Sequence, residues 1–214
     1  MFGQHYDFRA GERPDNSTIE QELARIDYRL VETDATRSSV RFLADGVRIN
    51  LGGIGKGYAV ERGIETLRSL GIRHARVTAG GDTRLLGDRR GQPWMIGVRD
   101  PRDANRVALR VPLADEAVST SGDYERYFVE DGIRYHHIIE PSTGEPASDV
   151  RSTTIIGPDA VMTDALSTSV FVMGVDSGLR LLSTLPDYEG VVIDAAGRLY
   201  YSDGLQPPEA GPGD

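Results

Sequence analysis

A lysine among glycines is the first feature of this chain that could do chemistry. The stretch NLGGIGKG, residues 50–57, places Lys56 among four glycines, and an apolar pattern typical of a helix follows. Glycine lets the backbone approach a ligand closely, and lysine supplies a mobile positive charge suited to phosphate oxygens. The stretch is too short for a GxxxxGK[ST] phosphate loop, and Gly57 stands where that motif needs Ser or Thr. Two interpretations stay open, a turn within a ligand site and a tight turn that only starts a helix.

An acid and two hydroxyls form a second group. In the stretch MTDALSTS, Asp164 and Thr168 are four residues apart and share one face of a predicted helix, with Ser167 beside them. Carboxylate and hydroxyl oxygens are ligands that Mg²⁺ accepts, with water and substrate phosphates completing its shell. The alternative is an acid that only favours the helix N-terminus and a threonine that only bonds back to a carbonyl.

Two histidines and a further aspartate complete the candidates. His136 and His137 are neighbours on a predicted strand, so one faces inward and the other outward, and only one can serve a site. A histidine could remove the proton of an attacking hydroxyl, or it could cap a loop. Asp82 follows two glycines and is either an ordinary turn residue or an acid held close to a ligand. Together these are the parts for metal-assisted phosphate chemistry.

Predicted helices must position two of these groups, Lys56 with its glycines and Asp164 with its hydroxyls. Apolar residues at helical spacing predict a helix over 17–26, where Ser17 and Glu20 would form a capping box. They also predict a helix that starts at the glycine turn and ends at Gly71. Further helices are predicted over 160–173 and near 178–184.

Predicted strands fill the chain between these helices. Alternating residues indicate hairpins turned on Asp45-Gly46 and on Asp131-Gly132, a turn at Gly80-Gly81, and a last hairpin over 190–202. Runs of hairpins broken by two or three helices favour an α+β fold with a mostly antiparallel sheet. We expect one catalytic domain over 1–204 and, because Pro and Gly are frequent there, a disordered tail over 205–214.

Composition excludes several functional classes. Thirty-three acidic against twenty-four basic residues give a net charge of −9, so there is no electrostatic footprint for nucleic acid or anionic lipid. The chain has no cysteine, which excludes disulfides, thiolate chemistry and Cys-type zinc sites. No apolar run approaches the roughly 18 residues of a membrane span, and the first residues lack the apolar centre of a signal peptide. We therefore expect a soluble chain without a membrane span.

Five motifs, in order, resemble the family of FAD:protein FMN transferases, the ApbE proteins. NLGGIGKGYAVERG is similar to the family's DLGGIAKGYAVD segment, AGGDTRLLG to NAGGD, and STSGDYERYF to TSGDYER. HIIEPSTGEP is similar to HIIDPRTGxP, and MTDALSTSVFVMG to ADALST followed by an apolar helix and a glycine. The resemblance covers about residues 26 to 203 of this chain.

The resemblance implies a reaction and a role for each matched residue. The family uses FAD and Mg²⁺, transfers the FMN half to a threonine hydroxyl of an acceptor flavoprotein subunit, and releases AMP. The implied FAD contacts fall on Asn50, Lys56, Asp82 and Ile139, the implied metal ligands on the Gly53 carbonyl, Asp164, Ser167 and Thr168, and the implied base on His137.

Two departures from the family pattern keep other functions open. Asn50 replaces an acid, and family members usually carry a longer segment ahead of these motifs, so the domain is expected to be short at its N-terminus. A flavin-nucleotide binding module without transfer activity is one alternative, and an Mg²⁺-dependent hydrolase that splits FAD into FMN and AMP is another. The acceptor, the oligomeric state, with a homodimer as one option, and the compartment stay open, since family members are often periplasmic or lipid-anchored.

Overall fold

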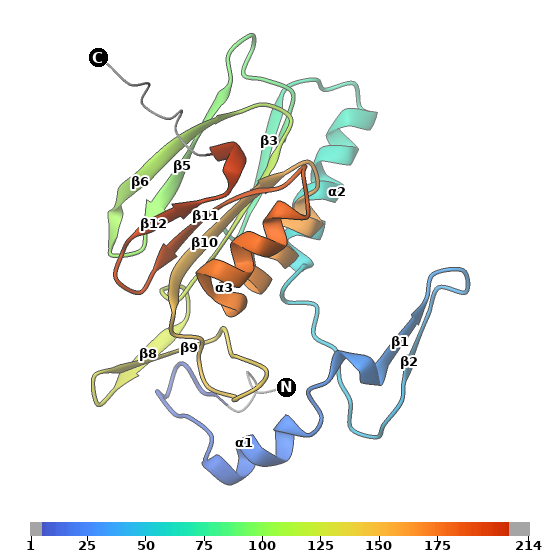
Figure 1. Cartoon of the computed structure of the whole chain (residues 1–214). Helices are drawn as coiled ribbons and strands as arrows, with labels where there is room; N and C mark the ends of the chain where they lie inside the picture. The colour runs from blue at the N-terminus through green and yellow to red at the C-terminus, as the bar shows by residue number, and fades with distance from the viewer. Residues whose placement is uncertain (1–5, 206–214) are drawn as a thin grey trace. The chain divides into compact units, whose positions relative to one another are not determined.

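The computed structural model describes residues 6–205, and these form two compact units (Figure 1). Unit 1 combines Met1–Leu51 with Tyr124–Ala147, and unit 2 combines Gly52–Asp123 with Ser148–Asp214. Most of the tail predicted to be disordered, residues 206–214, lies outside the described residues, and Leu205 ends a short 3-10 helix, Asp203–Leu205. The single catalytic domain over 1–204 stays a prediction.

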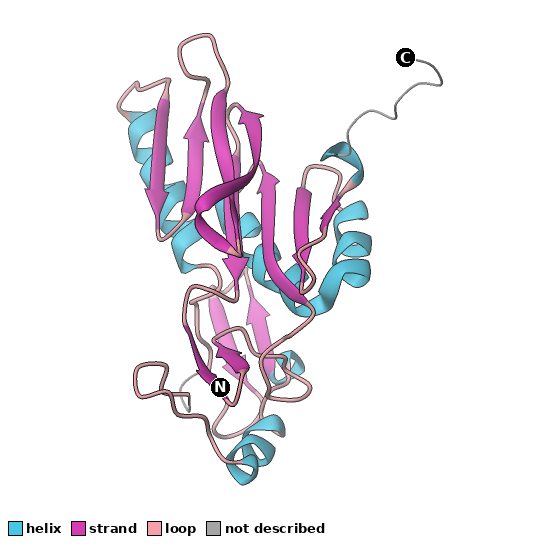
Figure 2. Cartoon of the chain, turned by 90° about the vertical axis from the view of Figure 1, so that its left-hand side faces the viewer, coloured by secondary structure: helices cyan, strands magenta, loops and turns pink. Residues whose placement is uncertain are grey.

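A six-stranded antiparallel sheet forms the centre of unit 2 (Figure 2). Its strands, in spatial order, are β12 (Leu199–Tyr201), β11 (Glu189–Asp194), β10 (Val150–Gly157), β7 (Ala117–Gly122), β4 (Asp82–Leu86) and β3 (Ala75–Ala79). All five residues of β4 are buried, and β10 is nearly as enclosed, because both faces of the sheet are covered. Together with the helices, this confirms the α+β prediction.

The two faces of the sheet have different partners. On one face, Leu85, Val118 and Ile156 form a cluster with Ile96, Val98, Val111 and Leu113 of a separate hairpin, β5 (Trp94–Asp100) and β6 (Asp103–Leu113). On the other face, helices α2 (Gly55–Ser69) and α3 (Ala160–Ser183) contact the strands and each other. Since side chains alternate along a strand, Asp82 and Arg84 face the helices while Thr83 and Leu85 face the hairpin.

Helix α2 begins and ends where the sequence predicts. Val60 and Ile64 are fully buried on its inner face. At its end, Gly71 has φ +81°, its N–H donates to the Arg68 carbonyl, and the Ile72 N–H donates to the Leu67 carbonyl. This is a Schellman motif, which satisfies the last carbonyls of the helix and needs a residue that tolerates positive φ.

Helix α3 joins the two helices predicted for the C-terminal part. Gly174, with φ 78° and ψ 178°, interrupts the helical backbone, and the Asp159 side chain caps the N-terminus by accepting from Met162 N. Among residues 6–205, α3 is the one helix that is long and apolar enough to cross a membrane by length and composition. Its buried Leu166, Val170 and Phe171 and its contacts with β7 and β10 are those of a core helix.

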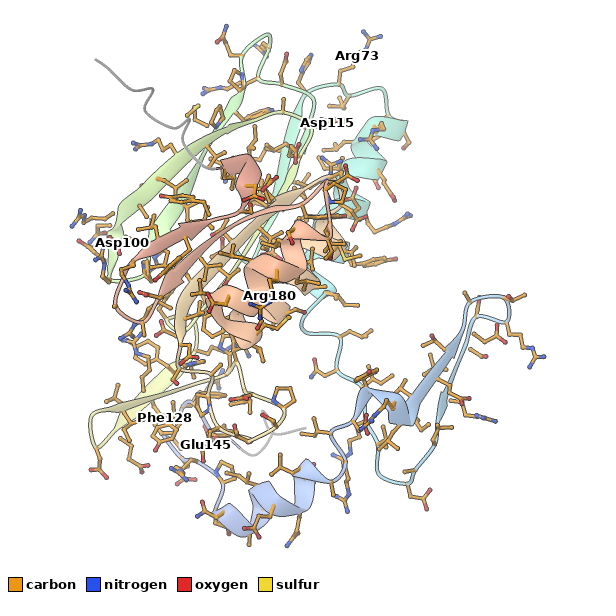
Figure 3. All side chains as sticks on the ribbon, in the orientation of Figure 1. Arg73, Asp100, Asp115, Phe128, Glu145 and Arg180 are labelled. Carbon is orange, nitrogen blue, oxygen red and sulfur yellow. The ribbon has the colours of Figure 1, made fainter. Side chains whose placement is uncertain are left out.

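Unit 1 contains short elements and a small aromatic core. These are α1 (Asn16–Leu23), a 3-10 helix (Tyr28–Leu30), and two hairpins, β1 (Val31–Asp34) with β2 (Ser39–Phe42) and β8 (Tyr127–Glu130) with β9 (Ile133–His136). Tyr6, Ile19 and Tyr135 are buried, and Phe8 and Phe128 pack against them. The rings of Phe128, which is labelled in Figure 3, and Tyr135 stack with their centroids 5.3 Å apart. The predicted turn at Asp131-Gly132 is confirmed, with positive φ at both residues.

Two local predictions in unit 1 are wrong. The N-cap of α1 is Asp15 and not Ser17, because the Asp15 carboxylate accepts from both Thr18 N (2.7 Å) and Ser17 Oγ (2.8 Å), and an ionised acceptor is the stronger cap. The predicted hairpin on Asp45-Gly46 does not form. Strand β2 pairs instead with the preceding strand β1, and the Leu43 N–H donates to the Leu30 carbonyl next to this pairing. With β2 paired to β1, the residues directly after Gly46 form no strand.

Candidate functional site

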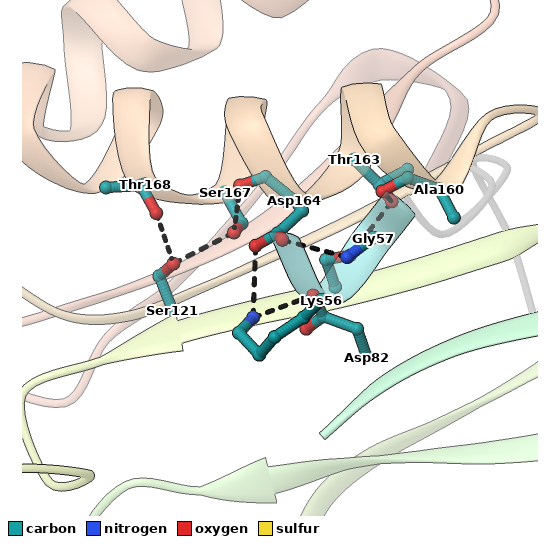
Figure 4. Close-up of polar contacts among 10 residues, drawn as sticks. Lys56, Gly57, Asp82, Ser121, Ala160, Thr163, Asp164, Ser167 and Thr168 are labelled. Carbon is teal, nitrogen blue, oxygen red and sulfur yellow. Dashed lines mark hydrogen bonds and ion pairs between the residues drawn. The ribbon is translucent and has the colours of Figure 1, made fainter. Parts of the chain in front are cut away.

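Lys56 lies between two buried carboxylates in unit 2 (Figure 4). Its Nζ donates to Asp82 Oδ2 at 2.7 Å and to Asp164 Oδ1 at 3.0 Å. Asp82 is 0% exposed and Asp164 is 1% exposed, while the Lys56 side chain is 39% exposed. We name these three residues the Lys56 cluster; they come from α2, β4 and α3, respectively, for Lys56, Asp82 and Asp164. The cluster holds a solvent-accessible cation against two buried acids.

The glycine after Lys56 makes this arrangement sterically feasible. Gly57 is in the first turn of α2, where N–H groups have no partner within the helix, and its N–H donates to Asp164 Oδ2 at 2.9 Å. A Cβ at Gly57 would overlap the carbonyl oxygen of Ala160 and lie 2.8 Å from the Asp164 Cβ. Only glycine therefore lets α2 approach α3 closely enough for Asp164 to bond the backbone of one residue and the side chain of its neighbour.

Asp82 carries an unsatisfied buried oxygen. It directly follows Gly80 and Gly81, which have φ of +56° and +95° and form the turn that the sequence predicts. Asp82 Oδ2 is bonded to Lys56, but Oδ1 has no hydrogen-bond partner among the described residues. Burial raises the pKa of Asp82 to about 6; the Lys56 ammonium opposes this shift, and the Asp164 carboxylate adds to it.

The two carboxylate partners of Lys56 stabilise its protonated, positively charged form. Burial by itself would lower the pKa of Lys56, but the hydrogen bonds and charges of Asp82, then of Asp164, raise the pKa above its usual value. The ammonium therefore stays protonated at neutral pH. It can present its exposed side to an anionic ligand although the chain as a whole carries −9.

Three hydroxyls lie beside the cluster. Ser121 Oγ of β7 is 2.9 Å from both Ser167 Oγ and Thr168 Oγ1 of α3, and Ser167 Oγ also donates to the Asp164 carbonyl. The alternative of an acid that only favours the helix N-terminus and a threonine that only bonds back to a carbonyl is therefore wrong: Asp164 bonds Lys56 and Gly57 N, and Thr168 bonds across to the sheet. Sequence reasoning missed Ser121, whose signal was its place in the STSGDY motif, on a strand that faces the predicted helix.

The donor set fits a hard cation. No cluster of three or more His, Asp and Glu side chains of the kind that holds a metal by itself occurs between residues 6 and 205. The Asp164 carboxylate, the orphaned Asp82 Oδ1 and the neighbouring hydroxyls are all oxygen donors, which Mg²⁺ prefers and which it supplements with water and phosphate oxygens. Gly53, whose carbonyl the resemblance implies as a ligand, lies in the turn directly before α2.

The remaining predicted residues belong to unit 1. Asn50 is exposed and outside any strand or helix, and Ile139 forms an isolated bridge with Pro146. His136 is buried and His137 is partly exposed, but His137 lies just beyond the end of β9, so the two histidines do not share a strand as predicted. His136 Nε2 is 2.8 Å from the Ala147 carbonyl, and its Nδ1 accepts from Ile138 N, so both ring nitrogens serve the fold. His137 Nδ1 is 3.4 Å from the Arg126 carbonyl, a longer contact.

Comparisons with known proteins agree on one family. The model of the ApbE family matches residues 2–192. The chain is 35% identical over 208 residues to an FAD:protein FMN transferase of Treponema pallidum, which covers 90% of this chain and 58% of that protein. It is 34% identical to the Klebsiella pneumoniae protein of the same name, covering 84% of this chain and 56% of the relative. The chain thus spans under two thirds of the length of these relatives.

Solved structures show the same fold. The ApbE protein of Thermotoga maritima superimposes with a TM-score of 0.85 at 40% identity, covering 95% of this chain and 66% of that one. The flavin transferase ApbE of Vibrio cholerae gives a TM-score of 0.77 at 29% identity, covering 90% of this chain and 62% of that one.

Proposed function

The chain belongs to the ApbE family, and on this premise we propose that it transfers the FMN half of FAD to a threonine hydroxyl of an acceptor flavoprotein, with Mg²⁺, and releases AMP. The observation that carries the proposal is the Lys56 cluster, an exposed cation fixed over two buried carboxylates and flanked by hydroxyls. This arrangement suits a pyrophosphate, which needs both a fixed cation and hard oxygen ligands around a metal.

In the proposed reaction, the threonine oxygen attacks the phosphorus of the FMN half. A new P–O bond forms, the bond from this phosphorus to the bridging oxygen of the pyrophosphate breaks, and AMP leaves with the bridging oxygen. The hydroxyl proton passes to His137, whose ring is partly exposed and has a weaker hydrogen bond than that of His136. Because a threonine hydroxyl is a weak nucleophile, removal of its proton is the task that needs a base.

Lys56 has the task of binding and orienting the pyrophosphate. Its ammonium is held by Asp82 and Asp164, so it contributes a fixed charge without the loss of side-chain freedom that a surface lysine would incur on binding. Asn50 and Ile139 contribute further contacts to FAD in this proposal. When bound by Asp164, Thr168, Ser167 and the Gly53 carbonyl, Mg²⁺ supplies neutralisation of phosphate charge.

The test uses the chain itself with FAD, Mg²⁺ and an acceptor protein or peptide that carries a target threonine. Mass spectrometry should find the acceptor increased by one FMN, together with AMP in equal amount. Lys56→Met should lower the rate about a hundredfold or more, the range for removal of a preorganised donor that stabilises developing charge. Arg62→Ala, which removes an exposed cation of the same helix, is the matched control and should leave the rate unchanged.

The outcomes separate the candidate functions. FMN and AMP free in solution, with an unmodified acceptor, would indicate the hydrolase instead. FAD binding without any cleavage would indicate a binding module. Full activity in a folded Lys56→Met variant would remove the Lys56 cluster from the reaction.

A further inference from the structure

A second polar group lies along the same helices and strand as the Lys56 cluster. Glu61 Oε2 accepts from Ala160 N at 2.8 Å and from Arg84 Nε at 3.2 Å, and Arg84 Nη1 donates to the Leu85 carbonyl at 2.6 Å. The side chains of Glu61 and Arg84 are 15% and 6% exposed, so this ion pair is largely removed from water. Glu61, Arg84 and the Ala160 N–H are named here the Glu61 node.

The Glu61 node joins the same three elements as the Lys56 cluster, namely α2, α3 and β4. Helix α2 carries Gly57 and Glu61, four residues apart, and α3 carries Ala160 and Asp164, also four apart. Strand β4 carries Asp82 and Arg84, two apart. Four residues return to the same face of a helix and two return to the same face of a strand, so both groups join the same three faces.

The node supplies directional bonds where the neighbouring packing is apolar. Val60, Ala117 and Ala160 are fully buried between these elements, and apolar contacts of this kind are non-directional. The Ala160 N–H belongs to the first turn of α3, where backbone donors lack a partner within the helix, while the cap residue Asp159 bonds Met162 N. Glu61 therefore provides the partner that fixes the start of α3 against α2.

A buried ion pair contributes little net stability, because desolvation offsets the attraction. Its directional bonds instead specify one arrangement of the elements that carry it. We infer that Glu61 is a positioning residue for the Lys56 cluster: by holding Ala160 N, it sets the distance from Asp164 to both Lys56 and Gly57. The consequence for FAD rests on the proposed function, whereas the geometric consequence does not.

Two signals report this geometry without any substrate. Lys56 is the only lysine of the chain, so protein labelled with ¹⁵N-lysine gives a single assigned lysine signal. The Gly57 amide, bonded to Asp164 Oδ2, should exchange slowly with solvent in the wild type. Glu61→Ala should move the Lys56 signal and speed exchange at Gly57 about tenfold, a change typical of coupled contacts.

Two variants control the experiment. Glu65→Ala, one turn further along α2 and exposed, removes an acid of the same helix and should change neither signal. Glu61→Gln keeps an oxygen for Ala160 N but loses the charge, so it should accelerate exchange at Gly57 only about threefold. If Glu61→Ala does not fold, Glu61→Gln decides by itself: acceleration at Gly57 supports the inference, and an unchanged rate overturns it.

FAD affinity, measured by calorimetry with Mg²⁺, links the geometry to the site. Glu61→Ala should weaken FAD binding about tenfold in the wild-type background and change it little in a Lys56→Met background, because positioning acts through Lys56. Equal losses in both backgrounds, or unchanged Gly57 exchange in Glu61→Ala, would overturn the inference. If the wild type binds no FAD, the proposed function fails, while the exchange rate and the Lys56 signal still decide whether Glu61 positions the cluster.

Discussion

At the scale of single residues, the two histidines differ in what they do for the fold. His136 is buried and uses both ring nitrogens in hydrogen bonds to the backbone of residues 138 and 147. His137 is partly exposed. The proposal assigns the base to His137 because a base must be able to meet the hydroxyl that it deprotonates.

We predict opposite effects of the two alanine substitutions. His137→Ala should keep the thermal midpoint and FAD binding but lower FMN transfer at least a hundredfold, within the usual contribution of a general base. His136→Ala should lower the free energy of unfolding by about 1–3 kcal/mol, because it leaves the Ala147 carbonyl and Ile138 N–H unsatisfied. Thermal melts and single-turnover transfer assays measure both. Equal transfer by wild type and His137→Ala would exclude this base.

The ion pair between the buried Asp100 and the exposed Arg102 gives a prediction about pH. Asp100, labelled in Figure 3, accepts from the Arg102 backbone N–H (2.9 Å), Nε (3.0 Å) and Nη2 (2.9 Å). The hydrogen bonds from Arg102 lower the pKa of Asp100 from 3.8 to about 2. Because the native state holds the carboxylate in its charged form, this stabilisation is present above pH 3.8 and is lost as the pH falls towards 2.

Asp100→Asn should therefore lower the free energy of unfolding by about 1 kcal/mol at pH 7, with the difference shrinking between pH 4 and pH 2. Urea unfolding at a series of pH values measures it. Arg102→Ala removes the two side-chain bonds and keeps the backbone N–H bond to Asp100, so it should show a smaller difference in the same pH window. A difference from wild type that does not change with pH would show that the loss is not one of charge stabilisation.

At the scale of elements, the contact between α2 and α3 depends on Gly57. A methyl group there would overlap the Ala160 carbonyl, whereas one at Gly55, two residues earlier on α2, would meet nothing within 4 Å. The two glycines thus form a matched pair in one helix turn: helix packing requires a glycine at 57, whereas a side chain at 55 would have room.

Gly57→Ala should separate α2 from α3 and lower the free energy of unfolding by about 1–3 kcal/mol, typical of overpacking, with loss of FAD binding. Gly55→Ala should be neutral or raise the free energy of unfolding by up to about 1 kcal/mol, because alanine is the better helix former. Denaturant unfolding and FAD titration of both variants measure these effects. Tolerance of Gly57→Ala with full binding would contradict the close approach of the two helices.

At the scale of the whole molecule, the two units have cores of different size. Unit 1 has Tyr6, Ile19 and Tyr135 as its buried cluster, with aromatic neighbours. Unit 2 has a cluster of seven buried side chains under β5 and β6 alone, in addition to the residues beneath α2 and α3. Since hydrophobic stabilisation scales with buried apolar area, unit 2 should be the more stable.

Native-state hydrogen exchange should show this difference. Amides of β8 and β9 in unit 1 should exchange with a lower opening free energy than amides of β7 and β10 in unit 2. Tyr135→Ala should reduce protection in β8 and β9 while leaving β7 and β10 unchanged. One common opening free energy for both sets, reduced together by Tyr135→Ala, would mean that the units unfold cooperatively.

Elements whose signals are local could be predicted from the amino-acid sequence. Alternation and paired glycine or Asp-Gly turns predicted β3 with β4 and β8 with β9, and helical spacing with Gly71 predicted α2 and its end. Family motifs selected Lys56, Asp82 and Asp164. The N-cap at Ser17 and the hairpin on Asp45-Gly46 were predicted wrongly, because the stronger acceptor, Asp15, and the available strand partner, β1, decide these two features.

The contacts among these residues depend on tertiary packing and could not be predicted from the sequence. Lys56, Asp82 and Asp164 are far apart in sequence, so neither the bridging ammonium nor the orphaned Asp82 oxygen has a local signature. Glu61 reads as one more charged residue of an amphipathic helix, yet it bonds the first turn of α3 and a buried arginine. These contacts depend on the crossing of two helices over one strand, which the packing of distant segments sets and no spacing along the chain encodes.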